Sequence, residues 1–197
     1  MRYASIDIET TGLITRTNGY IDNDLVEFGC VLDDLENPLP LDELPRCHCY
    51  FALDKYAGTP YALSMHSEIF KRIATKQEGY TYLHPSKFGL FFKSFLIDNG
   101  YTSENGRVII NAAGKNFGAF DCPFLEEKTS ICKHVKFRHR FLDPGPMYMT
   151  KSDDAVPGLD ECLRRIGIQN PIIAHTAIED AIDVIKVIRF KLLETKA

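Results

Sequence analysis

The sequence predicts an α/β protein with a mixed, five-stranded sheet that is flanked by helices. Three strand-like segments come first, helical and strand-like segments then alternate, and the helical segments carry apolar residues on one face. Short connections favour an antiparallel meander for the first three strands. Helical crossovers join the later strands, which should therefore run parallel to the first strand.

Length and composition predict a single domain that covers residues 1–197. Hydrophobic residues make up 45% and charged residues 25% of the chain, as in ordinary globular proteins. No apolar run reaches the roughly 18 residues of a membrane span, and the N-terminus lacks the apolar region of a signal peptide. We therefore expect a cytoplasmic protein without a membrane partner. The net charge of −4 argues against a broad electrostatic surface for nucleic acid.

The six cysteines are expected to be reduced and partly buried thiols. Cys47 and Cys49 are close in sequence, but a single C-x-C lacks the second pair that a zinc site needs.

The first strand spans residues 3–8 and ends in a Thr-Thr-Gly turn at 10–12. Because side chains alternate along a strand, Asp7 and Glu9 point to the same side near its end. Two like charges at this separation repel each other, and burial increases the repulsion. A bound cation would explain such a pair. The alternative is an edge strand with a solvated acidic face.

The next elements follow from turn residues and apolar periodicity. They are a polar loop (14–24), a strand (25–32), a proline-containing connection (33–46), a strand (47–53), a helix (65–75), a helix (85–99) and a strand (107–112). Ser64 is a plausible N-cap for the first helix. The second helix has apolar residues at 88, 91, 92, 95 and 96, which share one helical face. The apolar run at 107–112 predicts a strand that is buried on both faces.

The C-terminal part is expected to contain a helix (121–132), an extended segment (133–142), a short helix (158–166) and a last helix (175–196). The extended segment alternates. One side carries His134, Lys136, Arg138 and Arg140, and the other carries Val135, Phe137, His139 and Phe141. The basic side could attract a phosphate backbone, or it could protect a solvated sheet edge by its charge.

Two further stretches place acidic residues where strand ends could converge. Asp121 follows the predicted fourth strand at or near a helix start, where a carboxylate also serves as a cap. His175 and Asp180 open the last helix, and an isolated histidine there could equally be a surface or capping residue. Neighbouring Glu179 points about 100° away from Asp180 and is expected to be solvated.

Taken together, these motifs resemble the DEDDh family of 3′→5′ exonucleases, which have the ribonuclease H-like fold. The first family motif, Asp-x-Glu followed by Thr and Gly, matches Asp7-Ile-Glu9-Thr-Thr-Gly-Leu13. The second, an Asp preceded by Phe with Asn or His upstream, matches the stretch from Asn116 to Asp121. The third, His-x4-Asp, matches His175 to Asp180. The resemblance covers the whole chain, although residues 33–60 are longer and richer in proline than a minimal member needs.

The resemblance implies a catalytic site of four acids and one histidine. Asp7, Glu9, Asp121 and Asp180 would hold two divalent cations, Mg²⁺ or Mn²⁺. His175 would be the general base, because a histidine has a pKa near neutral pH. Single-stranded DNA or RNA would be cut from its 3′ end to release nucleoside 5′-monophosphates.

The resemblance also implies substrate contacts. Thr10 and Leu13 would pack on the terminal nucleotide, and Met65, His66 and Asn116 would lie near the substrate. For Met65 the alternative is core packing, and His66 could simply cap a helix or fill space. Phe120 is expected in the core rather than as a stacking platform. Many relatives form dimers, so a homodimer is one expectation.

Three other functions stay open at this point. They are an RNA-specific exonuclease similar to oligoribonuclease or ribonuclease T, a phosphodiesterase that acts on small nucleotides, and a non-catalytic nucleic-acid-binding module on the same fold.

Overall fold

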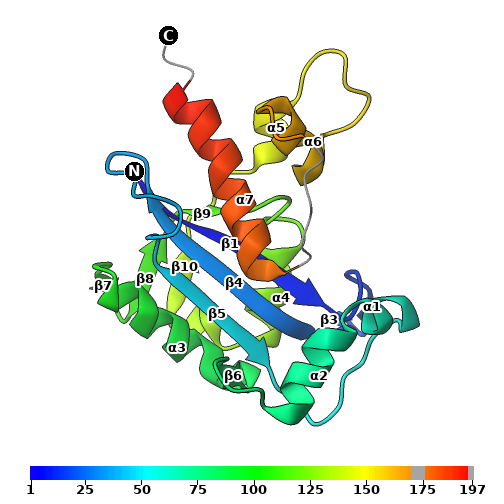
Figure 1. Cartoon of the computed structure of the whole chain (residues 1–197). Coiled ribbons are helices and arrows are strands. Elements are labelled where there is room, and N and C mark those ends of the chain that lie inside the picture. Colours follow the sequence, from blue (N-terminus) through cyan, green and yellow to red (C-terminus); the bar gives the residue numbers. More distant parts are fainter. Residues whose placement is uncertain (170–175, 195–197) are drawn as a thin grey trace.

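The computed structural model describes residues 1–169 and 176–194 of the chain. In this part of the chain, five strands form one mixed sheet in the order β6-β5-β4-β1-β9, with helices on its faces (Figure 1). These strands are β1 (Arg2–Thr10), β4 (Leu25–Asp34), β5 (Arg46–Phe51), β6 (Tyr82–Leu83) and β9 (Ala112–Ala113). The predicted α/β class and mixed sheet are confirmed.

The first three long strands form the predicted antiparallel meander. β1 pairs with β4, and β4 pairs with β5, both antiparallel. The register places Asp7 opposite Gly29 and Glu9 opposite Glu27. β9 runs parallel to β1, as the crossover connection predicted. The centre of the sheet therefore carries the predicted acidic pair.

The fourth predicted strand (107–112) is divided into β8 (Arg107–Ile110) and β9 at Asn111. Asn111 still joins the sheet, because its carbonyl accepts a hydrogen bond from the backbone of Ala4 at 2.9 Å. β8 belongs to a small sheet with β7 (Ser103–Glu104) and β10 (Val135–Phe137), in the order β10-β8-β7. The fifth strand of the main sheet is β6, which the sequence did not indicate.

β10 is shorter than the extended segment predicted at 133–142, although it is parallel to β8 as expected. Val135 and Phe137 are buried and Lys136 is exposed, in agreement with the predicted alternation. His139 is exposed, which contradicts its predicted inward side. The reason is that pairing with β8 ends at Phe137, so alternation no longer applies beyond it.

Helices cover the two faces of the main sheet. α3 (Pro85–Asp98) has Phe88, Phe92 and Leu96 fully buried against the face that carries Phe28, which confirms the predicted periodicity. α7 (Ala177–Arg189) lies over β1 and β4 on the opposite face (Figure 1). The last predicted helix is therefore shorter than 175–196 within the described residues, and a π-helical segment follows it at Phe190–Glu194.

The helix predicted at 65–75 corresponds to α2 (Ser67–Thr75), and a separate helix, α1 (Pro60–Met65), precedes it. The hydroxyl of Thr59 caps α1 by accepting a hydrogen bond from the backbone of Ala62. Ser64, the predicted N-cap, lies inside α1 and donates to the carbonyl of Tyr61. His66 is the residue between the two helices, so the junction of α1 and α2 determines where its side chain lies.

The remaining elements are α4 (Asp121–Lys128), the 3-10 helix Ile131–Lys133, α5 (Pro144–Tyr148), α6 (Leu159–Arg165) and the hairpin of β2 (Arg16–Thr17) and β3 (Tyr20–Ile21). The sequence indicated neither α5 nor the hairpin. Asp143 caps α5 by accepting from the backbone of Gly145, and Pro144 occupies its start, where a proline is tolerated. In the hairpin, Asn18 and Gly19 both have positive φ, as this turn requires.

All six cysteines are free, and five of them are buried, as expected for reduced thiols. Among the described helices, none combines the length and apolar character needed to cross a membrane.

Candidate active site

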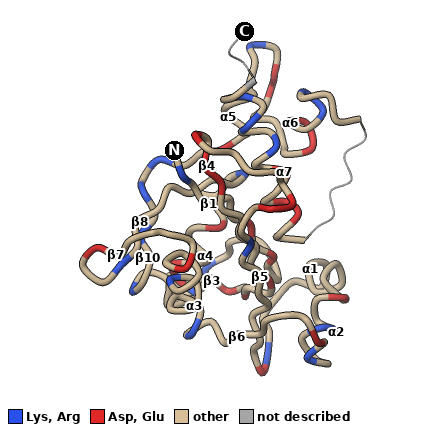
Figure 2. Tube along the Cα trace, turned by 60° about the vertical axis from the view of Figure 1, so that its left-hand side comes forward, with Lys and Arg blue, Asp and Glu red and all other residues tan. Residues whose placement is uncertain are grey.

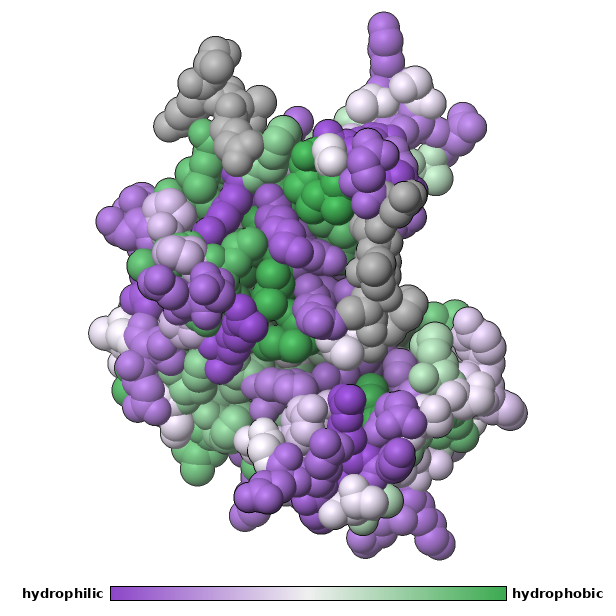
Figure 3. Space-filling model, in the orientation of Figure 1, coloured by the Kyte–Doolittle hydropathy of each residue, from purple (hydrophilic) through white to green (hydrophobic). Residues whose placement is uncertain are grey.

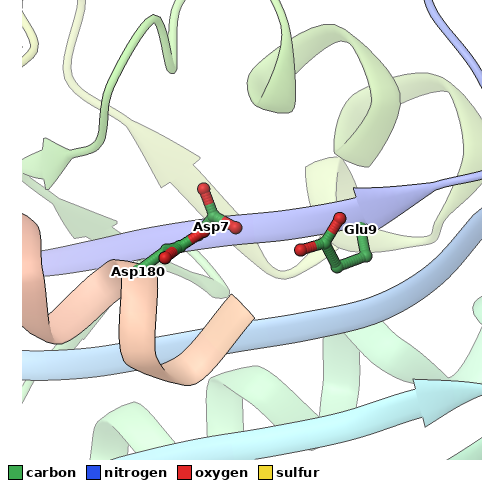
Figure 4. Close-up of side chains that lie close together, drawn as sticks. All are labelled: Asp7, Glu9 and Asp180. Atoms are coloured by element: carbon green, nitrogen blue, oxygen red, sulfur yellow. The ribbon is translucent and has the colours of Figure 1, made fainter. Parts of the chain in front are cut away.

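Three acidic side chains converge between the middle of the sheet and the first turn of α7. Asp7 and Glu9 project from β1 on the face that α7 covers, and Asp180 projects from α7 (Figure 4). One carboxylate oxygen from each of these residues lies within 4.8 Å of the others. The close spacing predicted for Asp7 and Glu9 is present, and Asp180 completes a cluster.

Small residues let α7 approach β1 and β4 closely enough to form this cluster. Gly29 lies opposite Asp7, and a Cβ at Gly29 would lie only 2.3 Å from the backbone carbonyl carbon of Ala177. The hydroxyl of Ser5 donates to the carbonyl of Ala181 at 2.7 Å. Ala177 and Ala181 are themselves fully buried. The position of Asp180 therefore depends on the lack of a side chain at Gly29.

Asp121 lies beside this cluster. It is the first residue of α4, is only 3% exposed, and accepts a hydrogen bond from the backbone of Ile8 on β1. The residue at the N-cap position of α4 is Phe120, so Asp121 is not the N-cap. The negative charge of Asp121 helps to raise the pKa of Asp7, although Asp121 is outside the group of three converging oxygens.

The cluster is electrostatically unfavourable without a counter-charge. Burial, with the charges of Asp121 and Asp180, raises the pKa of Asp7 well above its usual range. Burial and neighbouring carboxylates, Glu27 first among them, raise the pKa of Glu9 to about 8. Burial likewise raises the pKa of Asp121. A divalent cation would relieve this repulsion, and the all-oxygen donor set suits Mg²⁺ or Mn²⁺.

Glu27 is a site residue that the sequence analysis missed. It faces Glu9 across β1 and β4 and is fully buried. One of its oxygens, Oε1, lies 2.6 Å from Nε2 of His48 on β5. The sequence does show a charged residue inside an otherwise apolar strand. That this residue faces Glu9, however, follows only from the pairing register between β4 and β1.

A pocket of about 480 Å³ adjoins Glu9. Four of the predicted substrate residues line it, namely Thr10, Leu13, Met65 and His66. Tyr61 and Phe120 add aromatic surface to the wall. Phe120 packs against the core, as expected, but it is only partly buried and also lines the pocket. Figure 3 shows apolar side chains exposed over α1, the helix that carries Tyr61 and Met65. An apolar pocket next to an acidic cluster can hold an apolar ring close to a charged group.

The side chains of this pocket are held in different ways. Leu13 is 74% exposed, and its carbonyl accepts a hydrogen bond from Asn23 at 2.6 Å. Met65 is 47% exposed, so the alternative of core packing is wrong for this residue. His66 is buried, with Nε2 3.5 Å from Oε2 of Glu9. Thr10 is buried and donates to the carbonyl of Gly12.

Comparison with solved structures shows which fold this is. S. pombe Pop2p in its Mg²⁺- and Mn²⁺-bound form superposes with a TM-score of 0.60 at 17% identity, covering 96% of this chain and 83% of the Pop2p chain. Cell-death related nuclease 4 (CRN-4) gives a TM-score of 0.64 at 13% identity. That match covers 95% of this chain, which spans 62% of the CRN-4 chain. The chain has the ribonuclease H-like fold. No protein-family model and no curated protein matches the sequence.

His175 and Asn116 are the other two predicted site residues. His175 lies outside the described residues, two positions before the start of α7 in the sequence. Asn116 is exposed in a turn with a positive φ, and its backbone donates to Asp143 at 3.0 Å. It is not among the residues that line the pocket beside Glu9.

Proposed function

We propose that residues 1–197 are a single exonuclease domain that removes nucleoside 5′-monophosphates from the 3′ end of single-stranded nucleic acid, with divalent cations. The observation that carries the proposal is the convergence of Asp7, Glu9 and Asp180 beside an apolar pocket. The fold shared with Pop2p and CRN-4, one bound to Mg²⁺ and Mn²⁺ and the other a nuclease, gives support at the level of the fold.

In this proposal Asp7, Glu9, Asp121 and Asp180 hold two cations, which when bound would activate a water and stabilise the leaving oxygen of the scissile phosphodiester. Asp7 and Glu9 come from a central strand, and Asp180 comes from a helix fixed on that strand. The carboxylates are therefore oriented by the scaffold before any ligand binds.

The pocket beside Glu9 would bind the terminal nucleoside. Tyr61 and Phe120 offer aromatic surface on which a base can stack, and such stacking accepts any base. Leu13 and Met65 offer apolar contacts, while Thr10 shapes the turn at the end of β1. His66 would orient Glu9 from its buried position. Asn116 would contact the strand outside the pocket.

We assign the general base to His175, which would remove a proton from the attacking water. Replacement of His175 by Ala should abolish turnover while leaving cation binding intact, because the histidine is not a ligand in this proposal. Loss of cation binding in this variant would contradict the assignment.

The experiment that tests the function compares wild type with Asp180→Asn on a 5′-labelled oligonucleotide in Mg²⁺ or Mn²⁺. Glu179→Gln is the matched control, because Glu179 is exposed on the same helical turn. We expect wild type and the control to shorten the strand from its 3′ end, and Asp180→Asn to leave it intact. Equal digestion by all three proteins would contradict the assigned site.

Matched substrates separate the other functions. Degradation of RNA alone would indicate the RNA-specific enzyme, and cleavage of a dinucleotide but not of a long strand would indicate a small-nucleotide phosphodiesterase. Binding of an oligonucleotide without mononucleotide release in any divalent metal would indicate a non-catalytic module.

A further inference from the structure

Glu27 is a carboxylate in a place where the fold gives it little compensation. It is fully buried on β4, in register with Glu9 and on the side of the sheet where the acidic cluster lies. Burial of a carboxylate is costly unless its oxygens are hydrogen-bonded or paired with a cation. The charge of Glu27 contributes to the raised pKa values of both Glu9 and Asp7, so Glu27 lies close enough to repel the carboxylates of the cluster.

The two oxygens of Glu27 have different surroundings. Oε1 lies 2.6 Å from Nε2 of His48, a contact that joins β4 to β5 and fixes the direction of the carboxylate. Oε2 is buried and has no hydrogen-bond partner among the residues that the structure describes. An oxygen that is buried, fixed and unpartnered needs a donor that the described protein does not supply.

We propose that Glu27 is an outer carboxylate of the metal centre, whose Oε2 accepts a hydrogen bond from a water bound to the cation at Glu9. Glu27 does not belong to the group of carboxylates whose oxygens converge within 4.8 Å, which favours contact through water over direct ligation. His48 is the positioning residue that holds Glu27 in this orientation. The inference rests on the proposed function, because it requires a cation at Asp7, Glu9 and Asp180.

A purely structural role for the Glu27–His48 pair is the competing explanation. In that case the pair would only join β4 to β5, and its loss would lower stability without changing the affinity for a cation. Outer partners of a metal site, in contrast, typically contribute 10–100-fold to metal affinity. The affinity for Mn²⁺, measured without any substrate, therefore distinguishes the two roles.

The test is a titration of Mn²⁺ followed by electron paramagnetic resonance, with wild type, Glu27→Gln, Glu27→Asp and His48→Phe. Glu68→Gln is the control, because Glu68 is exposed on α2. We expect Glu27→Gln and Glu27→Asp each to weaken Mn²⁺ binding about 10–100-fold. His48→Phe should weaken it in the same direction, and Glu68→Gln should bind as wild type does.

The aspartate variant tests the contact itself, because it keeps the charge but withdraws the carboxylate by one methylene. Wild-type affinity in Glu27→Asp with weakened binding in Glu27→Gln would mean that only the charge matters, and would overturn the proposed contact. Wild-type affinity in all three variants would overturn the whole inference.

Melting temperatures in EDTA identify variants that fail to fold. We expect Glu27→Gln to melt no lower than wild type, because it removes one of several repelling charges. A lower melting temperature together with an unchanged Mn²⁺ affinity would support the structural role and overturn the inference. If wild type itself binds no Mn²⁺ at the cluster, it is the proposed function that fails.

Discussion

Asp7, Glu9 and Asp121 are acidic side chains that the fold holds at raised pKa. The pKa of Glu9 is about 8 in the folded protein, compared with 4.5 for the free side chain. Between these values the folded state binds more protons than the unfolded state, so the stability contributed by this protonation is complete below about pH 4.5 and is lost as the pH rises through 8.

We therefore predict that the melting temperature of the protein in EDTA falls between pH 5 and pH 8.5. Carboxylates with a lowered pKa, such as Asp153 beside Arg165, lose their contribution only in more acidic solution and do not obscure this trend. Mn²⁺ should restore the melting temperature most strongly at the alkaline end, where the cation no longer competes with protons. Differential scanning fluorimetry checks both trends, and a melting temperature that rises with pH in EDTA would contradict them.

Gly29 sets the distance between β4 and α7. A methyl group at this position would lie far inside contact distance of the backbone of Ala177, so the first turn of α7 would have to move. We predict that Gly29→Ala weakens Mn²⁺ binding and costs about 1–3 kcal/mol of stability, as is usual for overpacking.

Gly19→Ala is the control for Gly29→Ala. It introduces strain at a positive φ in the β2–β3 turn, where the space around it is open. We expect lower stability with unchanged Mn²⁺ affinity in this control. Equal Mn²⁺ affinity in Gly29→Ala would show that the close approach of α7 does not position Asp180.

At the scale of elements, regular apolar periodicity predicted the long strands and the long helix that covers one face of the sheet. β1, β4 and α3 carry uninterrupted patterns and were placed within a few residues of their observed bounds. The short elements α5, β2, β3 and β6 have two to five residues, too few for periodicity to show. The helix α1 was missed because its N-cap is Thr59, whereas the prediction began the helical region at Ser64.

The C-terminal part of α7 is fastened to the sheet through Asp33. Arg189 forms an ion pair with the fully buried carboxylate of Asp33, and the hydroxyl of Tyr3 donates to the same carboxylate at 2.7 Å. Arg189 also donates to the carbonyl of Leu39, so the proline-containing connection after β4 is tied to α7. This attachment gives part of residues 33–60 a structural role.

Removal of Arg189 should leave the charge of Asp33 buried and unpaired. We predict that Arg189→Ala lowers the free energy of unfolding by about 3–5 kcal/mol in urea denaturation. Arg164→Ala, which breaks ion pairs on the surface of α6, should cost less than about 1 kcal/mol. Similar losses in both variants would contradict a special role for the attachment to Asp33.

At the scale of the whole molecule, charge is unevenly distributed despite the net value of −4. Figure 2 shows basic residues along β8 and β10, away from the acidic cluster under α7. Lys136, Arg138 and Arg140 line a surface hollow of about 580 Å³ together with Ile109, Asn111 and His139. No ion pair to these three cations is present among the described residues.

If this hollow binds the strand upstream of the cut, its cations should contact phosphates. We predict that the triple change of Lys136, Arg138 and Arg140 to Gln weakens binding of a long single strand but not of a dinucleotide. The slope of log K against the logarithm of the salt concentration should become shallower by roughly 2, because each of the three lost phosphate contacts contributes about −0.7 to this slope. Unchanged affinity and slope would favour the alternative that these charges only protect the edge of β10.

Only the pairing of Asp7 with Glu9 followed from spacing in the sequence, whereas Asp121 and Asp180 were assigned to the site by the resemblance to the exonuclease family. Asp7 and Glu9 follow from strand alternation, while the approach of Asp180 depends on packing at Gly29 that no local pattern contains. Glu27 and Tyr61 were missed because cross-strand register and the position of α1 are tertiary features. The role of His175 stays a prediction.

The most direct test of the account is an anomalous difference map from a crystal of the protein grown or soaked with Mn²⁺. We predict Mn²⁺ density among the carboxylates of Asp7, Glu9 and Asp180 in wild type, and loss of that density in Asp180→Asn. A map with no Mn²⁺ at this cluster, or with Mn²⁺ bound only elsewhere on the molecule, would contradict the central claim that these carboxylates form the catalytic metal centre.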